Sequence, residues 1–138
     1  MKLFLDSSTI IYGFEFPQSN SGAILDLAVS GRLRPLTSEK AVEEVFRYFS
    51  LRKSEKYAYF ARKLVQSRFS VVPASSVARE ISRWRGKIKE KDLEHLATAK
   101  KFKALIVAFD RDFAPFPEYR TPRQAVEKLG KKPAKTEY

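Results

Sequence analysis

The segment ALIVAFDRD, residues 104–112, decides the fold of this chain. Its first six residues are apolar, which is typical of a short strand buried on both faces, and Asp110 follows directly. The preceding residues, 91–103, have the apolar spacing of a helix. A second strand is expected over residues 2–5, and it also ends at an acid, Asp6. Short buried strands that alternate with amphipathic helices predict an α/β sandwich around a parallel sheet.

The rest of the chain follows the same alternation. Ser38 is placed to cap one helix, and Gly31 and Gly130 are placed to end two others. Further strands are expected over residues 33–37 and 69–73, and helices over residues 23–30, 39–51, 54–68, 75–85 and 123–129.

Two local signals argue for irregular structure. Pro35 favours an edge or irregular position for its strand, because proline cannot donate to a sheet. Residues 19–22, with their Ser, Asn and Gly, indicate a loop. We expect a single domain over residues 1–130 and a basic, flexible tail over residues 131–138.

Composition excludes several classes of protein. The 138 residues include no Cys and one His, which excludes disulfide scaffolds, thiol nucleophiles, thiolate zinc sites and His-rich metal sites. No apolar run approaches the roughly 20 residues that span a bilayer, and Asp6 interrupts the first run too early for a signal peptide. We therefore expect a cytoplasmic protein with no membrane partner. The formal net charge of +11 indicates a polyanionic partner.

The five Asp residues are distributed differently from the eleven Glu. Asp6, Asp110 and Asp112 follow expected strands, and Asp92 lies in the first turn of a helix with its side chain on the apolar stripe. If the two strands are neighbours, these carboxylates meet at one sheet edge, where α/β folds bind ligands. Crowded carboxylates repel unless a cation lies between them, and oxygen ligands suit Mg²⁺ or Mn²⁺. Such an ion can support phosphodiester hydrolysis.

Each acid also has an ordinary explanation. Asp is common in turns and in the first turn of a helix, so the strand-end and helix-start acids could be turn or capping residues. Glu43 and Glu44 flank an apolar stripe about equally, and periodicity does not choose between them. His95, three residues after Asp92, is expected to be a surface or packed residue.

Four motifs in order resemble the PIN-domain family. They are DSS at residues 6–8, TSEKAVEEV at 37–45, KDLEHLATA at 91–99 and ALIVAFDRDF at 104–113, and the resemblance covers essentially residues 2–129. It implies a three-layer α/β/α sandwich with a central parallel sheet, and a ribonuclease that depends on Mg²⁺ or Mn²⁺. Many proteins of this family are toxins of VapBC-type toxin–antitoxin pairs. The resemblance therefore also implies RNA as substrate, an antitoxin protein as partner, and a homodimer.

The resemblance assigns roles to single residues. The implied catalytic residues are Asp6, Glu44, Asp92 and Asp110, and the implied metal ligands are Asp6, Asp92, Asp110 and the accessory Asp112. Glu44 is chosen over Glu43 because it lies six residues after Ser38. Ser8 matches a polar position expected at the substrate. One position departs from the family: Ala108 stands where Thr or Ser is frequent, which removes a hydroxyl that could orient a carboxylate or a water.

The densest basic and aromatic stretch covers residues 83–89. We expect Arg83, Arg85 and Lys87 to bind RNA phosphates, and Trp84 either to stack on an unpaired base or to pack on the core. A second stretch, residues 52–63, fits a solvated helix face or a contact with a protein partner.

Two other functions stay open at this point. Ala108 and the excess of positive charge suit a non-catalytic RNA-binding or assembly subunit on a degenerate PIN scaffold. An Asp-nucleophile phosphatase, with Asp6 or Asp110 as the phosphoryl acceptor, would not explain four grouped acids. The sequence has no Gly-rich phosphate loop, GxSxG motif or HExxH motif.

Overall fold

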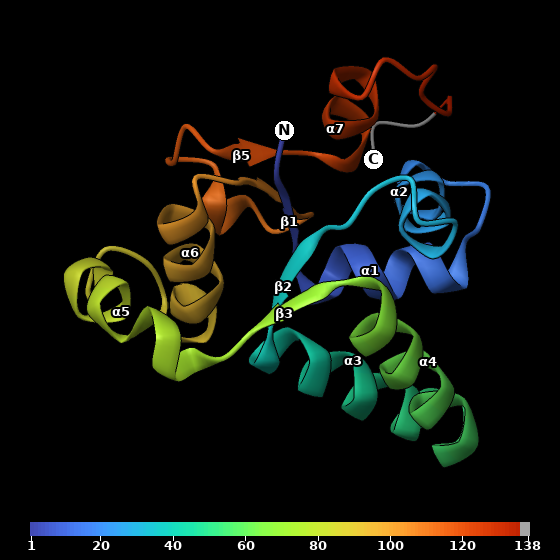
Figure 1. Ribbon diagram of the computed structural model, residues 1–138, viewed down its shortest axis with the longest axis horizontal. Helices are drawn as coiled ribbons and strands as arrows, with labels where there is room; N and C mark the ends of the chain where they lie inside the picture. Colours follow the sequence, from blue (N-terminus) through green and yellow to red (C-terminus); the bar gives the residue numbers. More distant parts are fainter. Residues whose placement is uncertain (136–138) are drawn as a thin grey trace.

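Five parallel strands form the centre of the molecule (Figure 1), whose computed structural model describes residues 1–135. They are β1 (Leu3–Leu5), β2 (Leu36–Ser38), β3 (Ser70–Val72), β4 (Leu105–Val107) and β5 (Tyr119–Arg120). The strands lie in the order β3-β2-β1-β4-β5, and each neighbouring pair is parallel. The chain therefore builds the sheet outward from β1 in one direction and then returns to add β4 and β5 on the other side.

Helices cover both faces of the sheet, which confirms the three-layer α/β/α sandwich. One face carries α1 (Ser7–Glu15), α2 (Asn20–Val29), α3 (Glu39–Arg52), α4 (Glu55–Arg68) and α7 (Pro122–Lys128). The other carries the short helix η1 (Ala74–Val77), α5 (Ala78–Trp84), α6 (Glu90–Phe102) and the short helix η2 (Arg111–Phe113).

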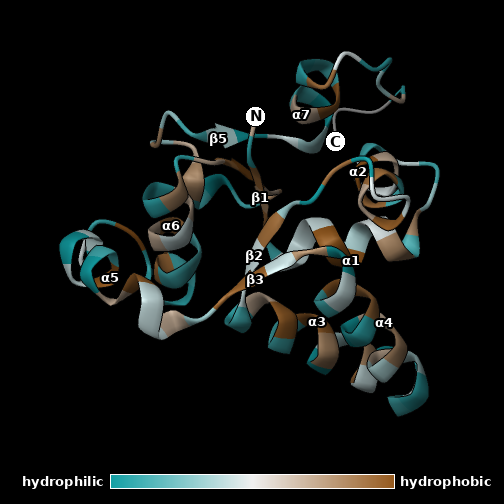
Figure 2. Ribbon diagram, viewed as in Figure 1, coloured by the Kyte–Doolittle hydropathy of each residue, from teal (hydrophilic) through white to brown (hydrophobic). Residues whose placement is uncertain are grey.

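Alternating strand residues divide the core into two clusters. Leu5 and Val107 pack with the helices of the first face, whereas Phe4 and Ile106 pack against α6, and all four are almost completely buried. The central strands accordingly show mostly hydrophobic colour in Figure 2. Because helices cover both faces of the sheet, its carboxyl edge is where polar strand-end groups can meet a ligand.

The loop expected over residues 19–22 is wrong, because α2 already begins at Asn20. The Ser19 hydroxyl caps this helix by accepting the N–H of Gly22 at 3.1 Å. A Cβ on Gly22 would lie 2.3 Å from the carbonyl oxygen of Pro17. Residue types that are common in loops therefore have other roles here: Ser19 caps the helix, and Gly22 allows the backbone of Pro17 to approach closely.

Of the edge or irregular position expected near Pro35, the edge position is wrong, whereas Pro35 itself does lie outside the regular strand. β2 lies between β1 and β3, and Pro35 precedes it, so the missing N–H costs no ladder bond within the strand. The Pro35 carbonyl instead accepts the N–H of Ser70 at 2.9 Å. Strand β5 was not among the expected strands, because a strand of two residues shows no periodicity in the sequence. Its residues Tyr119 and Arg120 pair with Ile106 and Val107 of β4.

The C-terminal segment is tied to the domain at Ala134. Its N–H donates to the side-chain oxygen of Asn20 at 2.7 Å, and its carbonyl accepts from Arg123 at 2.9 Å. Of the tail expected over residues 131–138, residues 136–138 lie outside the described part of the chain. Within residues 1–135, no helix has the length and apolar character required to cross a membrane.

Candidate active site

The carboxyl ends of β1 and β4 bring two acids to one edge of the sheet. Asp6 follows β1, and its N–H donates to the carbonyl of Val107 at 3.2 Å. Asp110 follows β4, which lies beside β1 in parallel register. The strand order reverses between these two strands, and such a switch point is where open parallel sheets bind ligands. The two strands are thus neighbours, which is the condition on which the convergence of these carboxylates depended.

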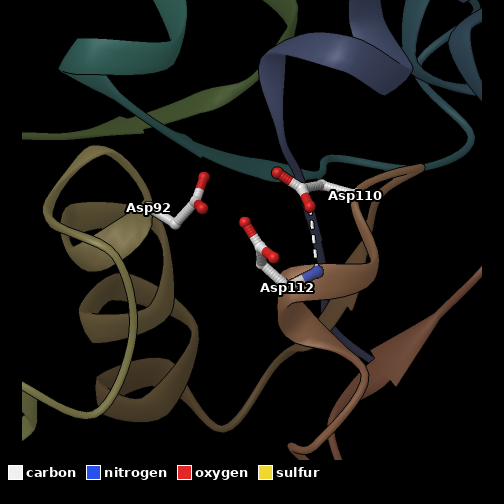
Figure 3. A group of neighbouring side chains, drawn as sticks. All are labelled: Asp92, Asp110 and Asp112. Atoms are coloured by element: carbon white, nitrogen blue, oxygen red, sulfur yellow. Dashed lines mark hydrogen bonds between the residues drawn. The ribbon is translucent and has the colours of Figure 1, made fainter.

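Three carboxylates converge at this edge. One oxygen from each of Asp92, Asp110 and Asp112 lies within 4.8 Å of the others, and Figure 3 shows the side chains directed toward a common space from α6 and from the segment around η2. The N–H of Asp112 donates to Asp110 Oδ1 at 2.9 Å. Asp92 Oδ2 is buried and accepts no hydrogen bond from the described residues. A buried carboxylate oxygen without such a partner is unusual, and a cation shared by the three acids would satisfy it.

Two lysines partly compensate this negative charge. Lys91 Nζ donates to Asp110 Oδ2 at 3.1 Å and lies 3.7 Å from Asp92 Oδ2. Lys89 Nζ lies 3.2 Å from Asp112 Oδ2. Both lysine side chains are well exposed and flexible. Their ammonium groups can therefore move away from the carboxylates without loss of core packing. Neither lysine was expected at the acids, although Lys91 immediately precedes Asp92 and Lys89 lies two residues before Lys91.

The pKa values of the acids are shifted in opposite directions. Burial raises the pKa of Asp92, and the neighbouring charges of Asp110 and Asp112 add to this rise against the attraction of Lys91. Burial acts in the same sense on Asp110, but the N–H of Asp112 and the ammonium of Lys91 bring its pKa below the usual value. The charged form of Asp92 is therefore destabilised in the metal-free site, and a divalent cation would offset that cost.

Asp6 combines a capping role with a place at the site. Its Oδ1 accepts the hydroxyl of Ser8 at 2.7 Å and the N–H of Thr9 at 3.2 Å, so it caps α1. It is 5% exposed, and burial raises its pKa against the effects of His95 and these hydrogen bonds. Among the described residues, Asp6 lies outside the group formed by the three converging acids. Its role as a metal ligand stays a prediction.

The two adjacent glutamates of α3 have different surroundings. Glu44 Oε1 accepts the hydroxyl of Ser7 at 3.0 Å and lies 3.1 Å from His95 Nε2. Burial alone would raise the pKa of Glu44, but the hydrogen bond and charge of His95 and the hydrogen bond of Ser7 lower it below the usual value. Glu43 is 61% exposed and lies 4.0 Å from Arg62. The structure thus connects Glu44, and not Glu43, to Ser7, which follows β1, and to His95 on α6.

His95 is packed, as expected, but it also connects two site elements. It is 2% exposed, and its Nδ1 lies 2.9 Å from the hydroxyl of Ser38. That hydroxyl accepts the N–H of Ala41 as the cap of α3, so its own proton is available to His95 Nδ1. When the ring is neutral, Nδ1 accepts that proton and Nε2 donates its own to Glu44. When the ring is protonated, Nε2 still donates to Glu44, and the ring adds the charge that lowers the pKa of Glu44. Sequence reasoning missed this role, because the partners lie more than 50 residues away.

Of the remaining predicted residues, Ser8 contacts a site acid, whereas the three basic residues lie on and after α5. Ser8 bonds to Asp6 and accepts the N–H of Phe109 at 3.4 Å, which positions the acid; its contact with substrate stays a prediction. Arg83, Arg85 and Lys87 are exposed on α5 and the loop before α6, where Arg85 pairs with Glu90 at 3.2 Å. Their binding of RNA also stays a prediction.

Trp84 packs on the core cluster of the α6 face. Its ring meets Phe116 edge-on at 6.1 Å, and Lys100 Nζ lies 4.4 Å from the ring centroid. Of the two roles considered for Trp84, the structure favours packing over base stacking.

Comparison with known proteins agrees with this architecture. A family model, that of the PIN domain, matches residues 3–118. The chain belongs to the PIN-domain family. Comparison of this PIN-domain sequence with curated proteins gave no match.

Several solved structures share the fold of this PIN domain. VapBC2 from Rickettsia felis, bound to a DNA fragment from its promoter, has a TM-score of 0.70 at 15% identity and covers 88% of this chain and 98% of its own. A toxin–antitoxin complex from Klebsiella pneumoniae has a TM-score of 0.68 at 22% identity, with the same coverage. VapC20 from Mycobacterium tuberculosis, a sarcin–ricin loop cleaving toxin, has a TM-score of 0.63 at 18% identity and covers 84% and 95%. At these identities, the likeness establishes the fold.

Proposed function

We propose that this PIN domain is an endoribonuclease that uses Mg²⁺ or Mn²⁺ to hydrolyse RNA phosphodiester bonds. The observation that carries the proposal is the convergence of Asp92, Asp110 and Asp112 around a buried oxygen without a hydrogen-bond partner, at the switch point of the sheet. Membership of the PIN-domain family supports it, and one protein of the same fold is a toxin that cleaves the sarcin–ricin loop.

Different residues at the site have different proposed roles. Asp92, Asp110 and Asp112 would hold the metal, with Asp6 at the neighbouring strand end as a further ligand. A bound Mg²⁺ or Mn²⁺ would activate a water and stabilise the charge that develops on the phosphate. Glu44 stays ionised because its pKa is lowered, and its carboxylate orients the attacking water. Lys89 and Lys91 pair with the acids in this structure, and they would be available to attract the phosphates of the RNA when a metal neutralises those acids.

We also propose that the domain is the toxin of a toxin–antitoxin pair. Several proteins of the same fold were solved as toxin–antitoxin complexes. On this chain, the end of α3 and the start of α4 expose large hydrophobic side chains, with Leu51 at 80%, Phe60 at 56% and Tyr59 at 55%. Such side chains suit a protein interface and support an antitoxin as partner. The homodimer and the cytoplasmic location stay predictions.

The two alternative functions explain less of the site. Ala108 and the excess of positive charge suggested a non-catalytic subunit. Ala108 is buried in the core cluster of the α6 face, and the positive charge suits a nuclease that acts on RNA equally well. Meanwhile the Ser8 hydroxyl supplies a hydrogen bond to the carboxylate of Asp6. A phosphatase needs one acceptor carboxylate, which leaves the convergence of three acids unexplained.

Metal-dependent cleavage of RNA tests the proposed function. We expect the purified protein to cut a labelled single-stranded RNA in Mn²⁺ or Mg²⁺, to stop when EDTA is added, and to recover when the metal is restored in excess. Hydrolysis by water leaves a linear phosphate, whereas attack by the ribose 2′-hydroxyl leaves a 2′,3′-cyclic phosphate. Mass spectrometry of the products therefore separates this activity from contaminating ribonucleases. Cleavage that is absent in all metals, or unchanged by EDTA, rejects the proposal.

The adjacent glutamates of α3 provide a matched pair of variants. Glu44→Gln is expected to lower the rate of RNA cleavage roughly tenfold, the lower end of what residues around a metal site contribute. Its amide keeps an acceptor for Ser7 but loses the charge that orients water. Glu43→Gln removes the same charge from an exposed position and is expected to change the rate less than twofold. Equal rates for the two variants, measured in Mn²⁺, would remove Glu44 from the mechanism.

A further inference from the structure

An open groove lies beside the acidic site, at the same edge of the sheet. It has a volume of about 730 Å³ and is formed by η2, by the end of β5 and by the outer face of α7. Arg111, which lines it, stands between Asp110 and Asp112 in the chain. The volume falls within the roughly 300–1,000 Å³ that is common for ligand sites. The groove therefore reaches the segment that carries Asp110 and Asp112, although neither acid belongs to its lining.

The charge of the groove is opposite to that of the acidic site. Three of its lining residues are cationic, namely Arg111, Arg120 and Lys128, whereas Glu127 is its one carboxylate. These side chains give the lining a net positive charge, which favours an anion as the ligand. This concentration of positive charge next to the acids is distinct from the basic stretch on α5.

Arg120 is already held in place at this groove. Its Nη1 donates to the carbonyls of Pro117 and Tyr119 at 2.8 and 2.7 Å. A guanidinium fixed in this way loses little side-chain entropy when it binds an anion. Beside it, Thr121 and Gln124 form the capping box that starts α7, so the wall of the groove is also fixed.

We propose that this groove, which we call the β5–α7 groove, binds the sugar-phosphate backbone of the RNA strand next to the scissile phosphate. The inference rests on the proposed ribonuclease function. A strand whose scissile phosphate lies at Asp92, Asp110 and Asp112 has neighbouring phosphates on each side, and Arg111 joins the groove to those acids in the chain. The cations then hold the strand where the acids alone would repel it. Because these contacts reach phosphates, they bind RNA without preference for sequence.

The test compares two double variants that remove the same charge from opposite edges of the sheet. Arg111→Gln with Lys128→Gln changes the groove at two exposed positions. The control, Arg68→Gln with Lys103→Gln, changes two exposed cations that precede β3 and β4 at the amino edge. Binding of a short fluorescein-labelled single-stranded RNA is followed by anisotropy in EDTA, over a series of salt concentrations, so that metal-dependent cleavage does not intervene. Circular dichroism verifies that both double variants are folded.

We expect the groove variant to bind the RNA roughly tenfold more weakly at low salt, and the control less than twofold. Each lost phosphate contact reduces the steepness of the plot of log binding constant against log salt concentration by about 0.7 for single strands. The groove variant lacks two cations, so its slope should be less steep by about 1.4. Equal weakening by both double variants, or no change in either, overturns the groove. Because cleavage is measured separately, groove-dependent binding without cleavage would keep the groove and reject the ribonuclease. Cleavage by the wild type, together with RNA binding that does not depend on the groove, would keep the ribonuclease and reject the groove.

Discussion

Asp92→Asn is expected to lower the rate of RNA cleavage about 1,000-fold, the upper range for loss of one group that stabilises transition-state charge. The carboxylate lies in the first turn of α6 with one oxygen near those of Asp110 and Asp112. An amide presents a neutral oxygen of similar shape, so the geometry is kept while the charge that holds a divalent cation is lost. The same substitution is expected to stabilise the metal-free protein.

The reason for the gain in stability is the raised pKa of Asp92. A carboxyl whose pKa is higher in the folded state than in the unfolded state contributes its stability when protonated, below the unfolded pKa. That contribution is lost as the pH rises through the folded pKa. At neutral pH the wild-type protein therefore carries a buried charge that Asn lacks. We expect the free energy of unfolding of Asp92→Asn to exceed that of wild type by about 0.5–2 kcal/mol at neutral pH. This difference should shrink at acid pH.

Thermal unfolding with and without Mn²⁺ checks both halves of this prediction. At a metal concentration 100 times its Kd, binding adds about 2.7 kcal/mol, which is roughly 10 °C in Tm for a chain of this length. Wild type should show this rise, and Asp92→Asn should not. Asp26→Asn is the matched control, because Asp26 is the remaining Asp and lies exposed on α2. A variant that keeps its Mn²⁺ response, or loses stability without metal, would contradict the assignment of Asp92.

The acids were predictable from the sequence because each has a local signal. Asp6 and Asp110 end recognisable strands, and Asp92 lies on the apolar stripe of its helix, so a parallel sheet with these strands as neighbours brings them to one edge. The neighbouring itself could not be read from residue patterns, since strand order depends on packing across the whole sheet. The choice between Glu43 and Glu44 likewise needed either the family resemblance or the contacts with Ser7 and His95.

The features that sequence reasoning missed lack a local signal or carry a misleading one. β5 has two residues, and its pairing with β4 is decided by the chain that precedes it. Ser19 and Gly22 have loop-forming residue types, but a cap and a close contact with Pro17 place them at a helix start. The contacts of Lys91 with the acids depend on how α6 faces η2, which is tertiary information.

His95→Ala is expected to lower the rate of RNA cleavage roughly tenfold, as much as Glu44→Gln, and to destabilise the fold as well. Among the described residues, His95 lies outside the group of three converging acids, and we expect it to act by holding Glu44. Without the imidazole, Glu44 loses its contact at 3.1 Å and the Ser38 hydroxyl loses its partner at 2.9 Å. The vacated space also lies beside Phe4, whose ring is 5.7 Å from that of His95. Together these losses should destabilise the fold by about 2–4 kcal/mol.

The pH dependence of cleavage separates a positioning role from simple loss of stability. In the wild type, the hydrogen bond and charge of His95 keep the pKa of Glu44 below its usual value against the effect of burial. A carboxyl with a lowered folded pKa contributes its stability above the unfolded pKa and loses it as the pH falls through the folded pKa. In His95→Ala the pKa of Glu44 should rise, because burial then acts with less opposition. The acid limb of the rate profile should therefore move to higher pH.

The matched control is His95→Gln, whose amide can still donate a hydrogen bond to Glu44 without carrying a charge. It should recover part of the rate at neutral pH and place the acid limb between those of wild type and His95→Ala. Profiles recorded well below each variant's Tm, in saturating Mn²⁺, keep unfolding out of the comparison. An acid limb that stays in place in both variants, with rates that follow stability alone, would leave His95 as a core residue with no part in orienting Glu44.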